Sequence, residues 1–184
     1  TFISLSGLSG VGAGLVAIVG CLLTFYILGQ HNIDYFDGKP NYYSYQVLWQ
    51  LASVAIVTLV LALMSGIYFT AKKSKKLGHP LWSAATKNTI KAAAIPLVTG
   101  GLFCIIVTLH HLFYLVAPCM LIFYGLALVS ASKYTQSDVF WLGMFELALG
   151  LFAAVFVGYG LIFWGIGFGV LHIVYGVWMY QKYK

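Results

Sequence analysis

Two ionisable side chains lie inside long apolar stretches of this chain, a glutamate at position 146 and a histidine at position 172. Both are flanked by glycines at one spacing, in the patterns Gly143-x-x-Glu146-x-x-x-Gly150 and Gly169-x-x-His172-x-x-x-Gly176. A helix turns by about 100° per residue, so each ionisable side chain shares a face with its small residues and points into the protein. Ionisable groups within a membrane are expensive and often functional, which makes Glu146 and His172 the candidate intramembrane polar site.

The helices that carry these two residues are joined by a short turn at residues 158–160, so we expect them to be antiparallel neighbours. A helix rises about 1.5 Å per residue, which puts Glu146 roughly 10 Å and His172 roughly 12 Å below the same membrane surface. A hydrogen bond or ion pair between the two side chains is therefore easy to form. The sequence does not say which of them holds the proton, because a nearby carboxylate and desolvation act on a histidine in opposite directions.

Three interpretations of this pair are open. It is a structural clamp that fixes the register of the last helical hairpin, a proton-linked or ligand-binding site, or part of a metal site. The metal interpretation is the weakest, because a metal needs three or four ligands and this pair supplies two. No metal ligand set and no cofactor are expected.

Other residues whose side chains could bind a metal lie in positions that do not form a site. His110 and His111 lie about four residues from the opposite end of their helix, roughly 10 to 15 Å from the depth of His172, and we interpret them as interfacial rather than as haem or copper ligands. The cysteines, Cys21, Cys104 and Cys119, lie in apolar blocks without metal-site spacing. No catalytic or phosphate-binding motif is present, so we expect no enzyme and no catalytic residues.

The composition is that of a membrane protein. Of the 184 residues, 61% are hydrophobic and 8% are charged, and the mean hydropathy is +0.93. A soluble domain is about a quarter charged, and a helix needs about 20 apolar residues to cross a bilayer. We therefore predict an all-α polytopic bundle that forms one transmembrane domain over residues 1–184, with six spans at about 4–29, 46–70, 96–114, 119–132, 139–157 and 161–180. Between the second and third spans, a lysine-rich loop at 71–95 is expected to hold a helix that lies on the membrane surface.

The lysines predict the orientation. All ten basic residues are lysine, and nine of them fall on one side of a six-span arrangement. Because positively charged loops stay in the cytoplasm, both termini and the loop at 71–95 are predicted to be cytoplasmic. The lysines thus report topology and give no sign of nucleic-acid binding; the expected surroundings are the lipid bilayer.

Small residues recur along three of the predicted spans and are expected to pack the helices together. Helices in lipid associate where small side chains let their backbones approach. The expected packing residues are Ser6, Gly10, Gly14, Gly143, Gly150, Gly165, Gly169 and Gly176. Such faces also suit a membrane-protein partner or a second copy of the chain.

The polar stretch at residues 30–45 is rich in tyrosine and contains Asp34 and Asp37. It is either an interfacial aromatic belt with an ordinary turn or a lid over an outward-facing cavity.

Three regions, residues 2–10, 122–135 and 167–176, resemble a family of uncharacterised six-span bacterial membrane proteins of the Bacteroidota type. The segments that carry the resemblance are Phe2-Ile-Ser-Leu-Ser-Gly-Leu-Ser-Gly10, Ile122-Phe-Tyr-Gly-Leu-Ala-Leu128, Ser132-Lys-Tyr-Thr135 and Gly167-Phe-Gly-Val-Leu-His-Ile-Val-Tyr-Gly176. The resemblance implies a multi-pass protein of the bacterial inner membrane and implies no activity.

The sequence supports two hypotheses for the function. The first is a structural, regulatory or partner-binding membrane protein, with Glu146 and His172 as a clamp. The alternative is a small-solute or proton-linked transporter, or a ligand-binding membrane protein, that uses the same pair as its site. No inverted repeat is evident that would favour transport, so the first hypothesis leads.

Overall fold

The computed structural model describes residues 7–37, 43–76, 78 and 82–182 of the chain. Within these residues it is all-α, with six helices long and apolar enough to span a membrane, which confirms the predicted bundle of six spans. By the length and composition of its helices, the chain is a multi-pass membrane protein whose surroundings are a lipid bilayer.

Five of the spans are built on single α-helices, and the sixth is divided. The five are α1 (Gly7–Gln30), α2 (Tyr45–Lys76), α3 (Ala84–Leu109), α4 (Val116–Ala131) and α5 (Asp138–Val155). The sixth consists of α6 (Gly160–Trp164), the π-helical segment η4 (Gly165–Leu171) and α7 (His172–Lys182). Short 3-10 turns lie in the connections: η1 (Tyr35–Asp37), η2 (Phe113–Leu115) and η3 (Ser132–Tyr134).

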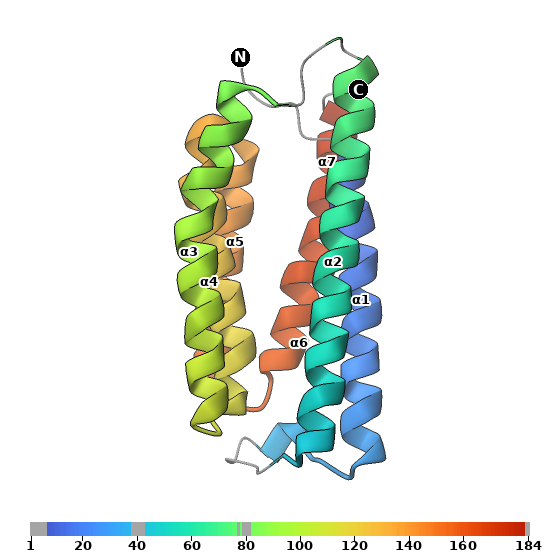
Figure 1. Cartoon of the computed structure of the whole chain (residues 1–184), viewed down its shortest axis with the longest axis vertical. Helices are drawn as coiled ribbons and strands as arrows, with labels where there is room; N and C mark the ends of the chain where they lie inside the picture. Colours follow the sequence, from blue (N-terminus) through green and yellow to red (C-terminus); the bar gives the residue numbers. More distant parts are fainter. Residues whose placement is uncertain (1–6, 38–42, 77, 79–81, 183–184) are drawn as a thin grey trace.

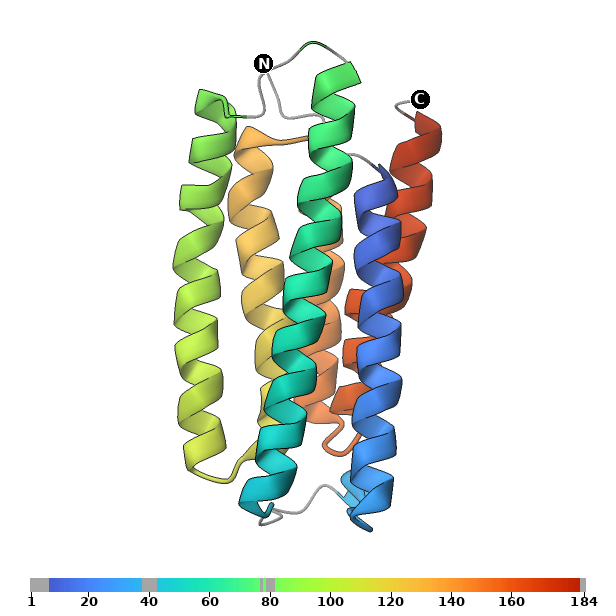
Figure 2. The same cartoon turned by 45° about the vertical axis from the view of Figure 1, so that its right-hand side comes forward.

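The helices form two layers (Figures 1 and 2). In the first layer, α1 lies between α2 and α7 and packs against both. In the second layer, α4 lies between α3 and α5 and packs against both. The layers meet mainly where α6 and η4 contact α4 and α5.

The two ends of the bundle differ in their residues. The lysine end holds the start of α1, the end of α7 and exposed lysines on several helices, namely Lys72, Lys75, Lys76, Lys87, Lys133 and Lys182. The tyrosine end holds the turn between α5 and α6 and the connection from α1 to α2, with Tyr35, Tyr43 and Tyr159.

The third span differs from the expected one. The helix expected at the membrane surface within 71–95 is not separate: α2 continues to Lys76, and α3 runs unbroken from Ala84 through Pro96. Ser83 starts α3 with a capping box, in which its hydroxyl accepts from the Thr86 backbone N–H and the Thr86 hydroxyl accepts from the Ser83 backbone N–H. Pro96 removes only one backbone donor, which a helix in a membrane tolerates.

The fourth span is longer than the sequence suggested. Its α-helix has 16 residues. The turns η2 and η3 extend it at both ends, so the apolar helical stretch from Phe113 to Tyr134 has 22 residues. This length is enough to cross a hydrocarbon core of about 30 Å.

Glycines bring the helices of the first layer into backbone contact. A Cβ atom at Gly10 would lie 2.9 Å from the His172 carbonyl oxygen, and one at Gly14 would lie 2.6 Å from the Gly169 carbonyl oxygen. Gly176 faces α1 in the same way, against the backbone of Gly7. Gly165 and Gly169 also face α1, with Cys21 and Ile18 as neighbours, whereas Ser6 lies outside the described residues.

In the second layer, Gly125 and Gly143 meet where α4 crosses α5. A Cβ atom at either glycine would come within 3 Å of the other's carbonyl oxygen, at 2.7 Å for Gly125 and 2.9 Å for Gly143. Further along α5, a Cβ atom at Gly150 would lie 2.7 Å from the side chain of Ile122. Each layer is therefore held by contacts that only glycine permits.

Candidate functional site

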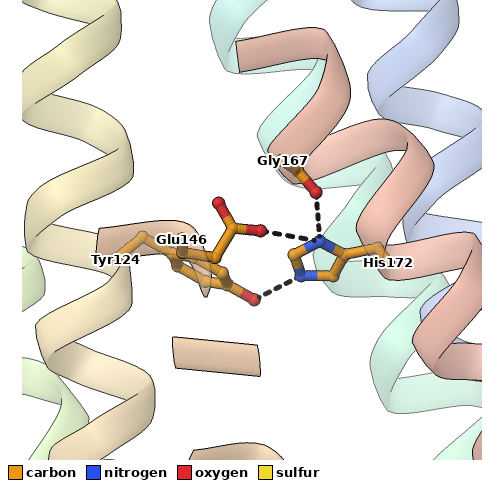
Figure 3. A network of polar contacts seen from close by, with 4 residues as sticks. All are labelled: Tyr124, Glu146, Gly167 and His172. Atoms are coloured by element: carbon orange, nitrogen blue, oxygen red, sulfur yellow. Dashed lines mark hydrogen bonds and ion pairs between the residues drawn. The ribbon is translucent and has the colours of Figure 1, made fainter. Parts of the chain in front are cut away.

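Glu146 and His172 meet between the two layers, together with Tyr124 and the backbone of Gly167 (Figure 3). Glu146 comes from α5 and Tyr124 from α4, both in the second layer. His172 is the first residue of α7, and Gly167 lies in η4. The network therefore joins the last span to the second layer near the middle of the bundle.

Both nitrogens of the His172 imidazole have hydrogen-bond partners. Nδ1 lies 3.0 Å from the Gly167 carbonyl oxygen, and Nε2 lies 2.8 Å from the Tyr124 hydroxyl. A carbonyl oxygen can only accept, so Nδ1 carries a hydrogen and donates it to Gly167. In the neutral imidazole, Nε2 has no hydrogen, and the Tyr124 hydroxyl must donate to it.

Protonation of His172 would change this arrangement. Nε2 would then carry a hydrogen and become a donor, so the Tyr124 oxygen would accept and its own hydrogen would need another acceptor. In the hydrogen bond between Tyr124 of α4 and His172 of α7, the donor therefore changes from Tyr124 to His172 when the imidazole is protonated.

Glu146 is fully buried, with 0% of its surface exposed. Its Oε1 lies 3.4 Å from His172 Nδ1, close enough for an ion pair. Neither carboxyl oxygen has a hydrogen-bond partner in the described part of the chain, because the hydrogen on Nδ1 is directed to the Gly167 carbonyl. A buried carboxyl group in this position lacks the hydrogen bonds that usually accompany buried polar groups.

The position of the carboxyl group depends on Gly167. A Cβ atom there would lie 2.5 Å from Glu146 Oε2 and 2.6 Å from the side chain of Leu121. Any larger residue would push the carboxyl group away from the imidazole. Glycine thus has a second role in the bundle: Gly167 lets a side chain approach the helix, whereas the glycines at the helix crossings let a helix backbone approach.

The π-helical segment η4 turns His172 toward the network. A π-helix closes hydrogen bonds between residues five apart, which inserts one extra residue into the turn and rotates the next part of the helix. Glycines at positions 165, 167 and 169 remove the side chains that would crowd so wide a turn. Such segments are frequent at functional sites.

Aromatic rings enclose the network. The Phe168 ring is stacked at 6.0 Å on the His172 ring and lies 4.8 Å from the Tyr124 ring. Trp164 lies 5.0 Å from Phe168 on the preceding turn, measured between ring centroids. The apolar surroundings strengthen the electrostatic effect of any proton that moves within the network.

The other candidate residues lie elsewhere. His110 caps the end of α3 and His111 follows with a positive φ of 59°, so both lie at the tyrosine end, away from His172. Among the described residues, no group of three or more His, Cys, Asp or Glu side chains is close enough to hold a metal ion.

Tyr124 was missed from the sequence. Tyrosines are common in this chain, with 13 of 184 residues, and most of the expected roles for them were at membrane surfaces. No local signal distinguished it: the contact of the next residue, Gly125, with Gly143 lies within the second layer and is visible only in the structure.

Comparison of the chain with family models, with curated proteins and with solved structures gives no match.

Proposed function

We propose that the protein is a proton-linked membrane protein in which Glu146, His172 and Tyr124 form the proton-binding site. The observation that carries this proposal is the Glu146 carboxyl group, which is fully buried and has no hydrogen-bond donor among the described residues, while an imidazole nitrogen lies 3.4 Å away. Intramembrane carboxylates and histidines in such chains are the usual proton carriers of pumps and transporters.

The proton has two places to reside within this network. With the proton on Glu146, the carboxyl group and the imidazole are both neutral, and Tyr124 donates to Nε2. With the proton on His172, an ion pair forms and the bond to Tyr124 reverses. Because the partners belong to different layers, each proton state joins the layers through a different set of bonds.

A structural or partner-binding role is the second candidate. It is favoured by the hydrogen bonds at both nitrogens of His172, which a clamp requires. Under this candidate the packing faces would dock a membrane-protein partner or a second copy of the chain. The proton-linked function takes precedence, because a clamp gains nothing from a buried carboxyl group that lacks a hydrogen-bond donor.

We also propose, from the lysine distribution and the family resemblance of the three segments, a bacterial inner-membrane protein of the Bacteroidota type, with both termini cytoplasmic. It is proposed not to be an enzyme.

The experiment uses the tryptophan that lies next to the site. The fluorescence of the protein in nanodiscs is recorded from about pH 4 to pH 9, a range that covers the ordinary pKa values of carboxyl and imidazole groups. We expect a titration that is lost in Trp164→Phe, which assigns it to that residue, and lost in the double variant Glu146→Gln with His172→Leu, which removes both groups that can hold the proton. Asp34→Asn removes a carboxylate at the tyrosine end and is the matched control. A titration that survives in the double variant, or no titration of the Trp164 signal in the wild type, would leave the clamp as the better account.

A further inference from the structure

The sixth span passes from one layer to the other along its length. At the tyrosine end, α6 packs against α4 and α5 of the second layer. At the lysine end, α7 packs against α1 of the first layer, and no comparable packing joins the described residues of α7 and α5. The change of partner takes place within η4, whose glycines and π-helical turn make it the most adaptable part of the span.

The tyrosine end ties the layers together by packing. The connection from α1 to α2 crosses to the second layer, where Tyr43 stacks on Phe113 with ring centroids 4.2 Å apart. The same connection covers the turn between α5 and α6. There, Phe36 packs on Tyr159 at 5.8 Å, and a Cβ atom at Gly158 would lie 2.5 Å from the Phe36 carbonyl oxygen.

Tyr35 belongs to the same packed region. Burial raises the pKa of the Tyr35 hydroxyl well above its ordinary value, so this side chain stays neutral while it packs there. Aromatic contacts of this kind are undisturbed by salt or by a moderate change of pH. The tyrosine end is thus firmly closed.

The lysine end joins the layers by a different kind of contact. Lys182 of α7 donates to both carboxylate oxygens of Asp138 at the start of α5, each at 2.9 Å. The Lys182 side chain is 43% exposed and that of Asp138 is 19% exposed. Because the lysine of this pair is partly open to solvent, water weakens the ion pair and salt screens it.

We infer that the lysine end is a gate: the first layer, which includes α7, swings about η4 away from the second layer, and the Lys182–Asp138 pair is its latch. The tyrosine end remains closed during this motion and serves as the pivot side. Opening would lead from the lysine side to the network of Glu146, His172 and Tyr124, so the inference rests on the proposed function for its purpose. Hinge motions of this type are absorbed by a few residues at the ends of elements, as η4 provides.

The test measures distances at both ends with pairs of spin labels, in nanodiscs and at one fixed pH. Cys21, Cys104 and Cys119 are first replaced by serine or alanine. The lysine-end labels are placed at Trp141 of α5 and Gln181 of α7, which are both exposed. The tyrosine-end labels are placed at Val155 of α5 and Gln30 of α1, which are also exposed.

We expect Asp138→Asn and Lys182→Gln to lengthen and broaden the lysine-end distance and to leave the tyrosine-end distance unchanged. The charge-reversed double variant, with Asp138→Lys and Lys182→Asp, restores the pair and should return the short distance. High salt should lengthen the lysine-end distance of the wild type and have no effect in Asp138→Asn. A lysine-end distance that is identical in all variants, or equal lengthening at both ends, would overturn the gate.

The outcome of this test is separable from that of the proposed function. The latch residues are not part of the proton-binding network, and the label distances do not depend on Trp164 fluorescence. If the distances respond and the Trp164 titration is absent, the gate stands and the proton-binding function fails. If the titration is present and the distances never change, the proton-binding function stands and the gate fails.

Discussion

The contacts within each layer differ in kind from the contacts between the layers. Within a layer, glycines such as Gly125 and Gly143 bring helix backbones together by close packing. Between the layers, the central contacts are polar and involve Glu146, His172 and Tyr124. Backbone packing of this density does not adjust continuously, whereas hydrogen bonds and ion pairs change with protonation and salt. The difference suggests two rigid layers joined by an adjustable set of contacts. We call the contacts among Glu146, His172 and Tyr124 the seam.

The largest expected effect comes from removing one partner of the seam. His172→Leu leaves the Glu146 carboxyl group buried without its imidazole neighbour, and we expect the free energy of unfolding to fall by about 3 to 5 kcal/mol. The double variant Glu146→Leu with His172→Leu removes both polar groups, so we expect it to regain most of that loss. Unfolding in bicelles measures both. A double variant less stable than the single one would show that the seam is needed for the fold.

Overpacking within a layer should have the next largest effect. Gly176→Ala places a methyl group 2.5 Å from the Gly7 carbonyl oxygen and 2.6 Å from the Val11 nitrogen, and backbone atoms cannot move aside easily. We expect a loss of about 2 to 3 kcal/mol. Gly101→Ala is the matched control, because nothing lies within 4 Å of its Cβ position. The pH titration of Trp164 should persist in any Gly176→Ala protein that folds, since the seam is intact.

Removing the Tyr124 hydroxyl should have a smaller effect. Tyr124→Phe deletes the bond to His172 Nε2, which lies at 2.8 Å, and keeps the ring in place. We expect a loss of about 1 kcal/mol in the free energy of unfolding, together with a shifted midpoint of the Trp164 titration. Tyr134→Phe, an exposed tyrosine at the lysine end, is the control and should change neither quantity. An unchanged midpoint in Tyr124→Phe would place Tyr124 outside the proton-binding network.

The smallest effect on stability is expected at the latch. Asp138→Asn breaks an ion pair whose lysine is 43% exposed, so the free energy of unfolding should fall by no more than about 1 kcal/mol. The loss should shrink further at high salt. A loss comparable with that of His172→Leu would mean that the lysine end is held by a strong, buried contact, and the contrast between layers and seam would fail there.

The sequence predicted the class of fold well, because the apolar block lengths and the glycine spacing are local properties. It also predicted the shared face and similar depth of Glu146 and His172, which the structure brings to 3.4 Å of each other. The arrangement in two layers and the contact with Tyr124 depend on which helices become neighbours, and local periodicity does not contain that information. The π-helical turn was hidden for the same reason, since three alternate glycines suit either close packing or a wide turn. Orientation in the membrane stays a prediction.

The most direct test of the proton-binding site is the infrared difference spectrum of the protein in nanodiscs between about pH 4 and pH 9. The chain has only four Asp and Glu residues, so the carbonyl band of a protonated carboxyl group can be assigned by single variants. We predict a pH-dependent band that disappears in Glu146→Gln, shifts its midpoint in Tyr124→Phe and is unaffected by Asp138→Asn. A wild-type spectrum without such a band, or a band that persists in Glu146→Gln, would contradict the proton-linked account.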